Sequence, residues 1–230
     1  NHLYPGYKSP AGMDPELLAQ FPIAEEAIEA LGLVVWPMVE FEADDAIGAA
    51  AVRFGADPDV ERILICTPDK DMAQLVVGER IVLRDRRRQI TYDEAGVLEK
   101  WGVEPASIPD WLALVGDASD GFPGLPGWGA KSAAAVLRRY GSLDAIPPRA
   151  SEWDVTGVSG AVRLAAVLEA QRADALLYRT LARLRLDAPL PQATAAELEW
   201  RGAPRATWEA FCDHWGLDRL RSRPHRWRTD

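Results

Sequence analysis

The sequence predicts an α/β core over residues 1–105, followed by a helical region over residues 106–230. In the first part, short apolar runs alternate with segments of helical periodicity, the pattern of a mostly parallel sheet covered by helices. After Pro105 only helical patterns follow, separated by turns that contain glycine and proline. An apolar content of 48% in 230 residues is sufficient for a hydrophobic core. We therefore expect two regions of different architecture within one globular chain.

Periodicity predicts the elements of the first region. Residues 1–14 are rich in turn formers and are expected to form a loop. Apolar residues three and four positions apart predict a helix over 17–31, which Gly32 ends. The other expected elements are strands at 33–36, 62–67 and 81–83, helices starting near residue 42 and over 72–76, and a turn at 84–88. The strand at 62–67 is apolar almost throughout, which is typical of a strand covered on both faces.

The second region is expected to consist of helices joined by turns. The expected helices cover 108–115, a segment ending at 140, a long stretch over 162–181, and 208–215. A proline- and glycine-containing connector covers 147–157, and residues 186–205 are expected to be loosely structured.

Composition narrows the class of protein. The formal net charge of −9 argues against a simple basic nucleic-acid binder. The basic residues are nevertheless clustered, at 84–88, at 131–139 and in an arginine-rich tail at 219–228, although each cluster is equally consistent with a solvated face. No apolar run is long enough to span a membrane and no signal-peptide pattern is present, so we expect a cytoplasmic protein that does not bind membranes. Cys66 and Cys212 are interpreted as buried thiols.

Three clusters of carboxylates stand at the ends of predicted elements. They are Glu42, Asp44 and Asp45; Asp69 and Asp71; and Asp117 and Asp120. Ligation by oxygen alone favours Mg²⁺ or Mn²⁺ over zinc. Seven carboxylates exceed what one Mg²⁺ takes, so they predict two ions, an arrangement suited to phosphodiester hydrolysis. A helix cap or a solvated acidic turn would explain any single cluster alone.

A glycine-rich hairpin follows the last cluster directly. The segment 124–129 removes side chains where a backbone must approach a ligand closely, and Gly124, Gly127 and Gly129 are the positions concerned. Lys131 and Ser132 then lie in the first turn of a helix, whose N–H groups and positive dipole end suit a phosphate.

The chain carries F-E-A-D-D-x-I-G at 41–48, T-P-D-K-D-M-x-Q-L at 67–75, and G-D-x-S-D-G-x-P-G-x-x-G-x-G-x-K-x-A at 116–133. These motifs, in this order, resemble the 5′-nuclease domain of bacterial DNA polymerase I and its stand-alone flap endonuclease and exonuclease relatives. The likeness extends from about Tyr4 to Tyr140. It implies a PIN-like α/β nuclease core with a central, mostly parallel sheet, joined to a helical region with a helix-hairpin-helix (H3TH) motif at about 121–140. The implied activity is cleavage of DNA near a 5′ single-strand/duplex junction, in replication and repair.

The resemblance also implies roles for individual residues. Glu42, Asp44, Asp45 and Asp69 resemble ligands of a first ion, with Asp71 at their edge, and Asp117 and Asp120 resemble ligands of a second. The hairpin, with Lys131, would bind duplex DNA, and its carbonyls could also hold K⁺. Tyr7 and Lys8 resemble the base of the family's arch, where the lysine approaches the scissile phosphate.

The chain also departs from the family pattern. It begins after the position of the family's first strand and that strand's metal-binding aspartate, and Ala11 stands where the family has an arginine. We expect a monomeric, stand-alone enzyme of the bacterial cytosol. Two alternatives stay open, a catalytically impaired DNA-junction binder of the same fold and a PIN-type ribonuclease.

Overall fold

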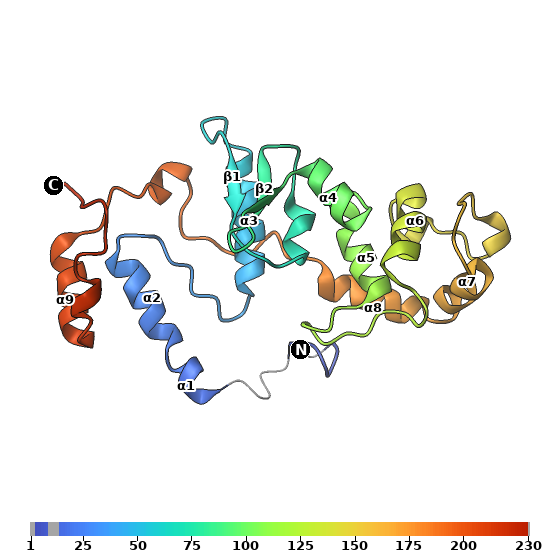
Figure 1. The fold of residues 1–230 in the computed structure, drawn as a ribbon, viewed down its shortest axis with the longest axis horizontal. Coiled ribbons are helices and arrows are strands. Elements are labelled where there is room, and N and C mark those ends of the chain that lie inside the picture. Colours follow the sequence, from blue (N-terminus) through green and yellow to red (C-terminus); the bar gives the residue numbers. More distant parts are fainter. Residues whose placement is uncertain (1–2, 9–13, 230) are drawn as a thin grey trace. The chain divides into compact units, whose positions relative to one another are not determined.

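The computed structural model describes residues 3–8 and 14–229 (Figure 1). The chain forms two compact units. The first unit comprises Asn1–Ser9 and Ile47–Asp187, and the second comprises Pro10–Ala46 and Ala188–Asp230. Each unit has its own hydrophobic core. The position of Ala11, which the sequence analysis compared with a family arginine, lies outside the described residues.

The first unit contains a small mixed sheet. Its strands are β1 (Ile63–Ile65), β2 (Ile81–Asp85) and β3 (Ile90–Tyr92), in the order β1-β2-β3. β1 pairs with β2 in parallel, whereas β2 and β3 form an antiparallel hairpin. The predicted α/β class is therefore confirmed. The predicted mostly parallel sheet is not, because the described strands form one parallel and one antiparallel pair. The prediction of a strand at 33–36 is wrong, since those residues form no strand.

The helices of the first unit include those predicted from the sequence, and also α4, which the sequence analysis missed. They are η1 (Asp71–Leu75), α4 (Glu94–Trp101), η2 (Pro105–Ser107), α5 (Ile108–Val115), α6 (Ala130–Tyr140), η3 (Leu143–Ala145), η4 (Ala150–Glu152), α7 (Ala161–Ala170) and α8 (Arg172–Ala182). α3 (Ala43–Gly55) begins in the second unit and ends in the first. The long helix expected over 162–181 is in fact two helices, because the backbone leaves helical geometry at Gln171, with φ −118° and ψ 28°.

α5 is the centre of the first unit. Every residue from Ile108 to Leu114 is buried, and α5 packs against α6 and α8. Its buried Asp110 accepts hydrogen bonds from the Leu143 N–H (2.9 Å) and from Arg179 Nη1 (3.2 Å). A buried carboxylate needs such partners to offset its lost hydration. These bonds fix α8 and the start of η3 to the N-terminal part of α5.

The described N-terminal residues pack onto the same unit. Tyr4 meets Tyr178 edge to face, and Tyr7 Oη donates to the Leu181 carbonyl (3.1 Å). Gly121 has φ +86°, and a Cβ at this position would lie 2.1 Å from the Gly6 carbonyl oxygen. Only glycine permits that contact. The segment is therefore held against the loop after α5 and against α8.

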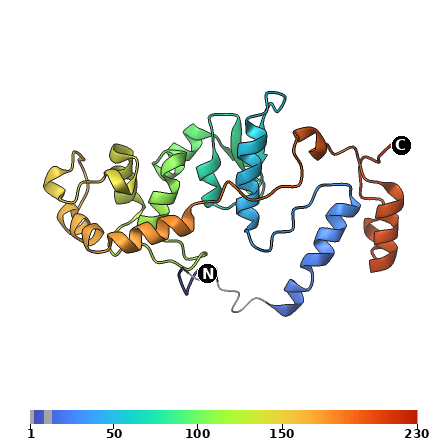
Figure 2. The same ribbon diagram turned by 180° about the vertical axis from the view of Figure 1, so that it is seen from behind.

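The second unit contains α1 (Pro15–Leu18), α2 (Phe21–Ala30), η5 (Ala195–Leu198), α9 (Arg205–Trp215) and η6 (Asp218–Leu220). α2 and α9 lie side by side, as Figures 1 and 2 both show, around a core of Ala30, Trp208, Phe211 and Cys212. Cys212 is buried as expected, but the same expectation for Cys66 is wrong because that thiol is exposed. Of the described helices, none has the length and apolar character needed to cross a membrane.

Candidate metal centre and nucleic-acid interface

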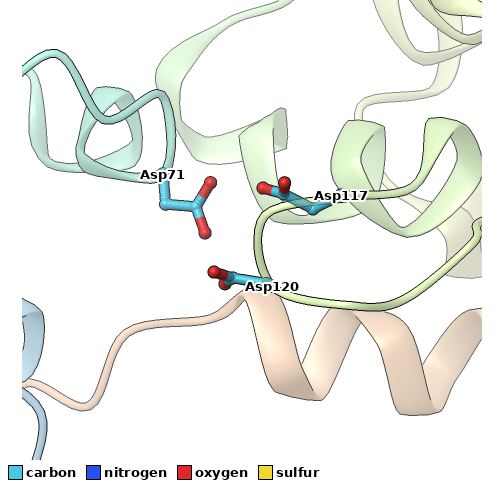
Figure 3. Close-up of side chains that lie close together, drawn as sticks. All are labelled: Asp71, Asp117 and Asp120. Carbon is cyan, nitrogen blue, oxygen red and sulfur yellow. The ribbon is translucent and has the colours of Figure 1, made fainter. Parts of the chain in front are cut away.

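Three of the predicted carboxylates converge in the first unit. Asp71, Asp117 and Asp120 each offer a carboxylate oxygen, and these oxygens lie within 4.8 Å of one another. Figure 3 shows the three side chains turned toward a common point, with Asp71 on one segment and the other two on the loop after α5. All three are buried, with relative exposures between 4% and 8%. Asp71 therefore forms one acidic site with two residues that follow it by 46 and 49 positions in the chain.

The loop after α5 is closed tightly by its own hydrogen bonds. The Asp117 N–H donates to the Phe122 carbonyl (2.8 Å), while the N–H groups of Gly121 and Phe122 donate to the Asp117 carbonyl. Asp117 Oδ1 accepts from Ser119 twice, from the backbone N–H (3.0 Å) and from Oγ (2.8 Å). These bonds fix the direction of the Asp117 carboxylate and close the backbone turn that carries Asp120.

Asp71 has an unusual environment for a carboxylate. Its Oδ1 is buried and has no hydrogen-bond partner among the residues that the structure describes. Burial, followed by repulsion from Asp69, Asp120 and Asp117, raises the pKa of Asp71 to about 8. A buried acidic oxygen without a partner costs free energy, so its retention requires an explanation outside the fold itself.

Lys70 partly neutralises the site, and the sequence analysis did not single it out. Its ammonium group forms a very short contact with Asp117 Oδ2. Burial by itself would raise the pKa of Asp117, but hydrogen bonds from Lys70 and Ser119 outweigh burial and hold that pKa below its usual value. The D-K-D spacing was the available signal, because it places a cation between two of the predicted acids.

Lys8 contacts another member of the cluster, Asp120. Its N–H donates to the Asp120 carbonyl (3.0 Å), and its Nζ lies 3.7 Å from Asp120 Oδ2. The Lys8 side chain is 29% exposed, so the ammonium group is accessible from solvent. The backbone at Lys8 has φ +40°, a strained value for a residue with a side chain. This strain is consistent with a functional constraint on the position.

The three-aspartate cluster fits a hard divalent cation. Its donors are carboxylate oxygens alone, which suit Mg²⁺ and Mn²⁺. A bound cation would supply the missing partner of Asp71 Oδ1 and offset the repulsion among the three groups. The residues present therefore satisfy the chemical requirements of a metal site.

The other predicted ligands are placed differently. Asp69 Oδ1 accepts the Asp71 N–H (3.0 Å), so Asp69 adjoins the cluster without belonging to it. Glu42, Asp44 and Asp45 stand around the start of α3 in the second unit, where Asp45 Oδ2 accepts the Glu42 N–H (3.1 Å) and thereby caps the helix. Their role as ligands stays a prediction.

The glycines of the hairpin have different surroundings. A Cβ on Gly124 would lie 2.3 Å from the Gly116 nitrogen, so this buried glycine is required for packing against the end of α5. Its burial argues against the predicted direct DNA contact at Gly124. Gly127 (φ +84°) and Gly129 are exposed, and a Cβ on either would meet no backbone atom within 4 Å. These two positions leave the backbone open to a ligand.

The start of α6 has the features of an anion site. Ser132 Oγ accepts the Gly129 N–H (3.1 Å) and donates to the Gly129 carbonyl (3.0 Å), so this predicted DNA contact acts first as a helix cap. Lys131 is exposed and has no partner among the described residues. Arg163 on α7 was missed by the sequence analysis, although its Nη2 lies 3.6 Å from where a Cβ on Gly127 would be. Trp128 is buried and donates to the Leu164 carbonyl (3.3 Å), which packs the hairpin on α7.

Two family models match successive parts of the chain. Residues 1–102 match the N-terminal resolvase-like domain of 5′-3′ exonucleases, and residues 103–206 match their C-terminal SAM fold. The chain belongs to the 5′-3′ exonuclease family. The resemblance read from the three motifs is thereby confirmed.

Relatives of this exonuclease family are similar over most of the chain. DNA polymerase I of Mycobacterium leprae is 38% identical over 193 residues, which is 82% of this chain and 20% of that protein. The 5′-3′ exonuclease of Aquifex aeolicus is 37% identical over 146 residues, or 63% of this chain and 49% of the relative. The chain thus spans about one fifth of the length of its DNA polymerase I relatives and half of the Aquifex protein.

Solved structures share the fold of this exonuclease family member at low identity. The T5 D15 protein co-crystallised with metal ions gives a TM-score of 0.62 at 19% identity, covering 94% of this chain and 80% of that one. The catalytic core of Rad2 in complex with DNA substrate gives a TM-score of 0.54 at 16% identity, covering 89% and 65%. These likenesses support the α/β fold with a helical C-terminal part.

Proposed function

We propose that this chain is a divalent-metal-dependent 5′-nuclease that hydrolyses phosphodiester bonds of DNA near a 5′ single-strand/duplex junction. The observation that carries the proposal is the buried cluster of Asp71, Asp117 and Asp120, in which Asp71 Oδ1 has no hydrogen-bond partner within the described part of the chain. Membership of the 5′-3′ exonuclease family supports the reaction class. Solved relatives are described with metal ions and with DNA, which supports both the cofactor and the substrate.

In the proposed site, Asp71, Asp117 and Asp120 would hold one divalent ion, and Asp69 adjoins them. Glu42, Asp44 and Asp45 stay predicted ligands of a second ion. Divalent ions would orient the phosphate and neutralise charge that develops during displacement. We assign Lys8 the role of approaching the scissile phosphate and stabilising its charge, and its Nζ at 3.7 Å from Asp120 Oδ2 supports this role. Lys70 balances the charge of Asp117 when the site holds no cation.

The same proposal assigns the hairpin to substrate binding. The backbone at Gly127 and Gly129, together with Lys131, contacts duplex DNA, and the hairpin carbonyls form the proposed K⁺ site. Because the loop after α5 continues directly into this hairpin, the grip on the duplex lies at a fixed offset from the acidic cluster. That offset would determine the cut position.

The direct test uses the unmodified protein and a 5′-labelled flap DNA. We expect cleavage with Mg²⁺ or Mn²⁺, no cleavage with EDTA, and binding without cleavage in Ca²⁺. Binding without cleavage in all metals would contradict the nuclease and favour a junction-binding protein. Faster cleavage of a matched RNA flap would favour a ribonuclease.

The hairpin assignment has its own expected result. Replacing Lys131 or Arg163 with alanine should each raise the Kd for flap DNA about 3- to 10-fold and lower the salt slope of binding by about 1, because each substitution removes one phosphate contact. Single-turnover cleavage at saturating enzyme should change less than about 2-fold. Arg138→Ala is the matched control, since Arg138 lies on the same α6 but at its C-terminal end. A purely chemical defect in the Lys131 variant would contradict the assignment.

A further inference from the structure

We propose a second phosphate-binding site on the first unit, formed by the Arg86–Arg88 turn between β2 and β3. It would hold the backbone of the DNA strand beside the acidic cluster. The inference rests on the proposed function for its substrate, but neither the hairpin nor the metal ligands take part in it. The residues concerned line a cavity of about 600 Å³, whose walls are Cys66, Thr67, Pro68, Asp85, Arg86, Arg87 and Arg88.

The cavity lies where α/β sheets ordinarily bind ligands. Cys66 follows the last residue of β1, and the arginines follow the last residue of β2. β1 and β2 are adjacent parallel strands, so their C-terminal ends meet at the same edge of the sheet. Ligands of open α/β sheets bind in the crevice outside this edge.

The charge of the cavity favours an anion. Three consecutive arginines face a single carboxylate, Asp85, whose Oδ1 accepts the Arg88 N–H (2.9 Å) and whose Oδ2 lies 3.8 Å from Arg88 Nε. The guanidinium groups of Arg86 and Arg87 are exposed and have no ion-pair or hydrogen-bond partner among the described residues. Adjacent like charges repel one another, and a polyanion relieves that repulsion. In a chain with a net charge of −9, such a local cluster is a place where DNA can be attracted.

The turn is held in a defined shape rather than left loose. Arg84, which precedes it, donates across the hairpin to the Gln89 carbonyl (3.1 Å), to Gln89 Oε1 (2.7 Å) and to Thr91 Oγ1 (2.7 Å). Gln89 adopts φ +60°, and its side chain donates to the Arg86 carbonyl. Arg84 thus supports the turn, and Arg86, Arg87 and Arg88 project from it. A preorganised turn loses less entropy when it binds.

The cavity is linked to the acidic cluster by a short chain segment. Thr67 Oγ1, in the cavity wall, accepts the Asp69 N–H (3.1 Å), and Asp69 in turn accepts the Asp71 N–H. Thr67 and Asp71 are four positions apart in the chain, so their Cα atoms are at most about 14 Å apart. With a rise of about 3.4 Å per nucleotide along a strand, the cavity lies within about four nucleotides of the phosphate at the acidic cluster. A strand that reaches the cluster can therefore reach the arginines.

The central test compares Arg86→Ala/Arg87→Ala with the native chain in Ca²⁺, where binding is measured without cleavage. We expect the Kd for flap DNA to rise about 10-fold and the salt slope to fall by about 1.4 to 1.8, as expected for two lost phosphate contacts. Arg86→Lys/Arg87→Lys should restore most of the affinity, because lysine also binds phosphate as a point charge. The control is Arg62→Ala/Arg138→Ala, since Arg62 precedes the opposite end of β1. An unchanged Kd and slope in the alanine variant would overturn the inference.

Neutral methylphosphonate linkages, placed singly within four nucleotides of the cut site, identify the phosphate that is held. One or two of them should weaken binding to the native chain but not to the alanine variant. If every linkage weakened DNA binding equally in the native chain and in the alanine variant, the inference would be overturned. Mg²⁺-dependent cleavage by the native chain is a separate readout, so failure of the nuclease proposal is distinguishable from failure of this one.

Cys66 provides a local reporter, because it is exposed in the cavity wall while Cys212 is buried. Flap DNA should slow alkylation of Cys66 at least about 5-fold in the native chain and less than 2-fold in the alanine variant. Protection by inorganic phosphate at equal ionic strength, without protection by DNA, would show a small-anion site and overturn the inference.

Discussion

Replacing Asp120 with asparagine is expected to lower the single-turnover rate of flap cleavage in Mg²⁺ by at least about 1000-fold, equivalent to about 4 kcal/mol of transition-state stabilisation. Asparagine keeps the size of the side chain but removes its charge. Asp120 is one of only three carboxylates whose oxygens lie within 4.8 Å of one another in the described part of the chain, so losing its charge weakens the cation site directly. Quenched-flow cleavage of labelled flap DNA measures the rate.

Binding should survive this substitution. The Kd for flap DNA in Ca²⁺ is expected to stay within about 3-fold, because the hairpin and the arginine turn are unchanged. Asp93→Asn serves as the control, since Asp93 caps α4 by accepting the Gly96 N–H (2.8 Å), and asparagine caps helices equally well. Full activity of the Asp120 variant would remove this residue from the metal site.

Replacing Asp71 with asparagine is expected to stabilise the metal-free protein while abolishing cleavage. Asp71 is 5% exposed, and burial with repulsion from Asp69, Asp120 and Asp117 raises its pKa to about 8. Between pH 4 and pH 8 the folded state keeps a proton that the unfolded state has released. Stability supplied by that proton is complete below pH 4 and is lost as pH rises toward 8, at up to about 1.4 kcal/mol per pH unit.

The free energy of unfolding of Asp71→Asn should depend less on pH than that of the native chain. Asparagine carries no charge, so the free energy of unfolding of Asp71→Asn should equal that of the native chain at pH 4 and below, and should exceed it increasingly as pH rises, by several kcal/mol at pH 8. Urea unfolding in EDTA at several pH values measures this difference. Adding Mg²⁺ should raise the stability of the native chain much more than that of the variant. A parallel pH dependence for both proteins would contradict the assigned environment of Asp71.

Short-range patterns predicted most of the helices well. α5 and the C-terminal end of α6 fall at the expected residues, since their apolar periodicity and following glycines are local signals. The strand β3 was missed because Ile90–Tyr92 is only three residues long and follows an arginine run. Its pairing with β2 depends on cross-strand partners such as Leu83 opposite Tyr92. The break at Gln171 was also missed, because the apolar positions continue through it.

The candidate site was predicted in composition but not in grouping. The residues now found together were assigned to two sets, with Asp71 at the edge of the first and Asp117 and Asp120 in the second. Lys70 was not singled out although it stands between two predicted acids, and Arg163 was not singled out because a lone cation in a sequence gives no indication of what it contacts. Gly124 was grouped with the open glycines, although its close approach to Gly116 becomes visible only in three dimensions.

By itself, the sequence determined the family of this protein. The spacing of acids, glycines and the following helix start is local, so it identified the family and predicted an oxygen-ligand metal site beside a phosphate-binding hairpin. The tertiary structure decided which groups meet. Packing of α8 on α5 and the contact of Gly6 with Gly121 bring Lys8 to Asp120, and the parallel pairing of β1 and β2 brings the arginine turn beside Thr67. These contacts join residues far apart in the chain, and no short-range pattern encodes them.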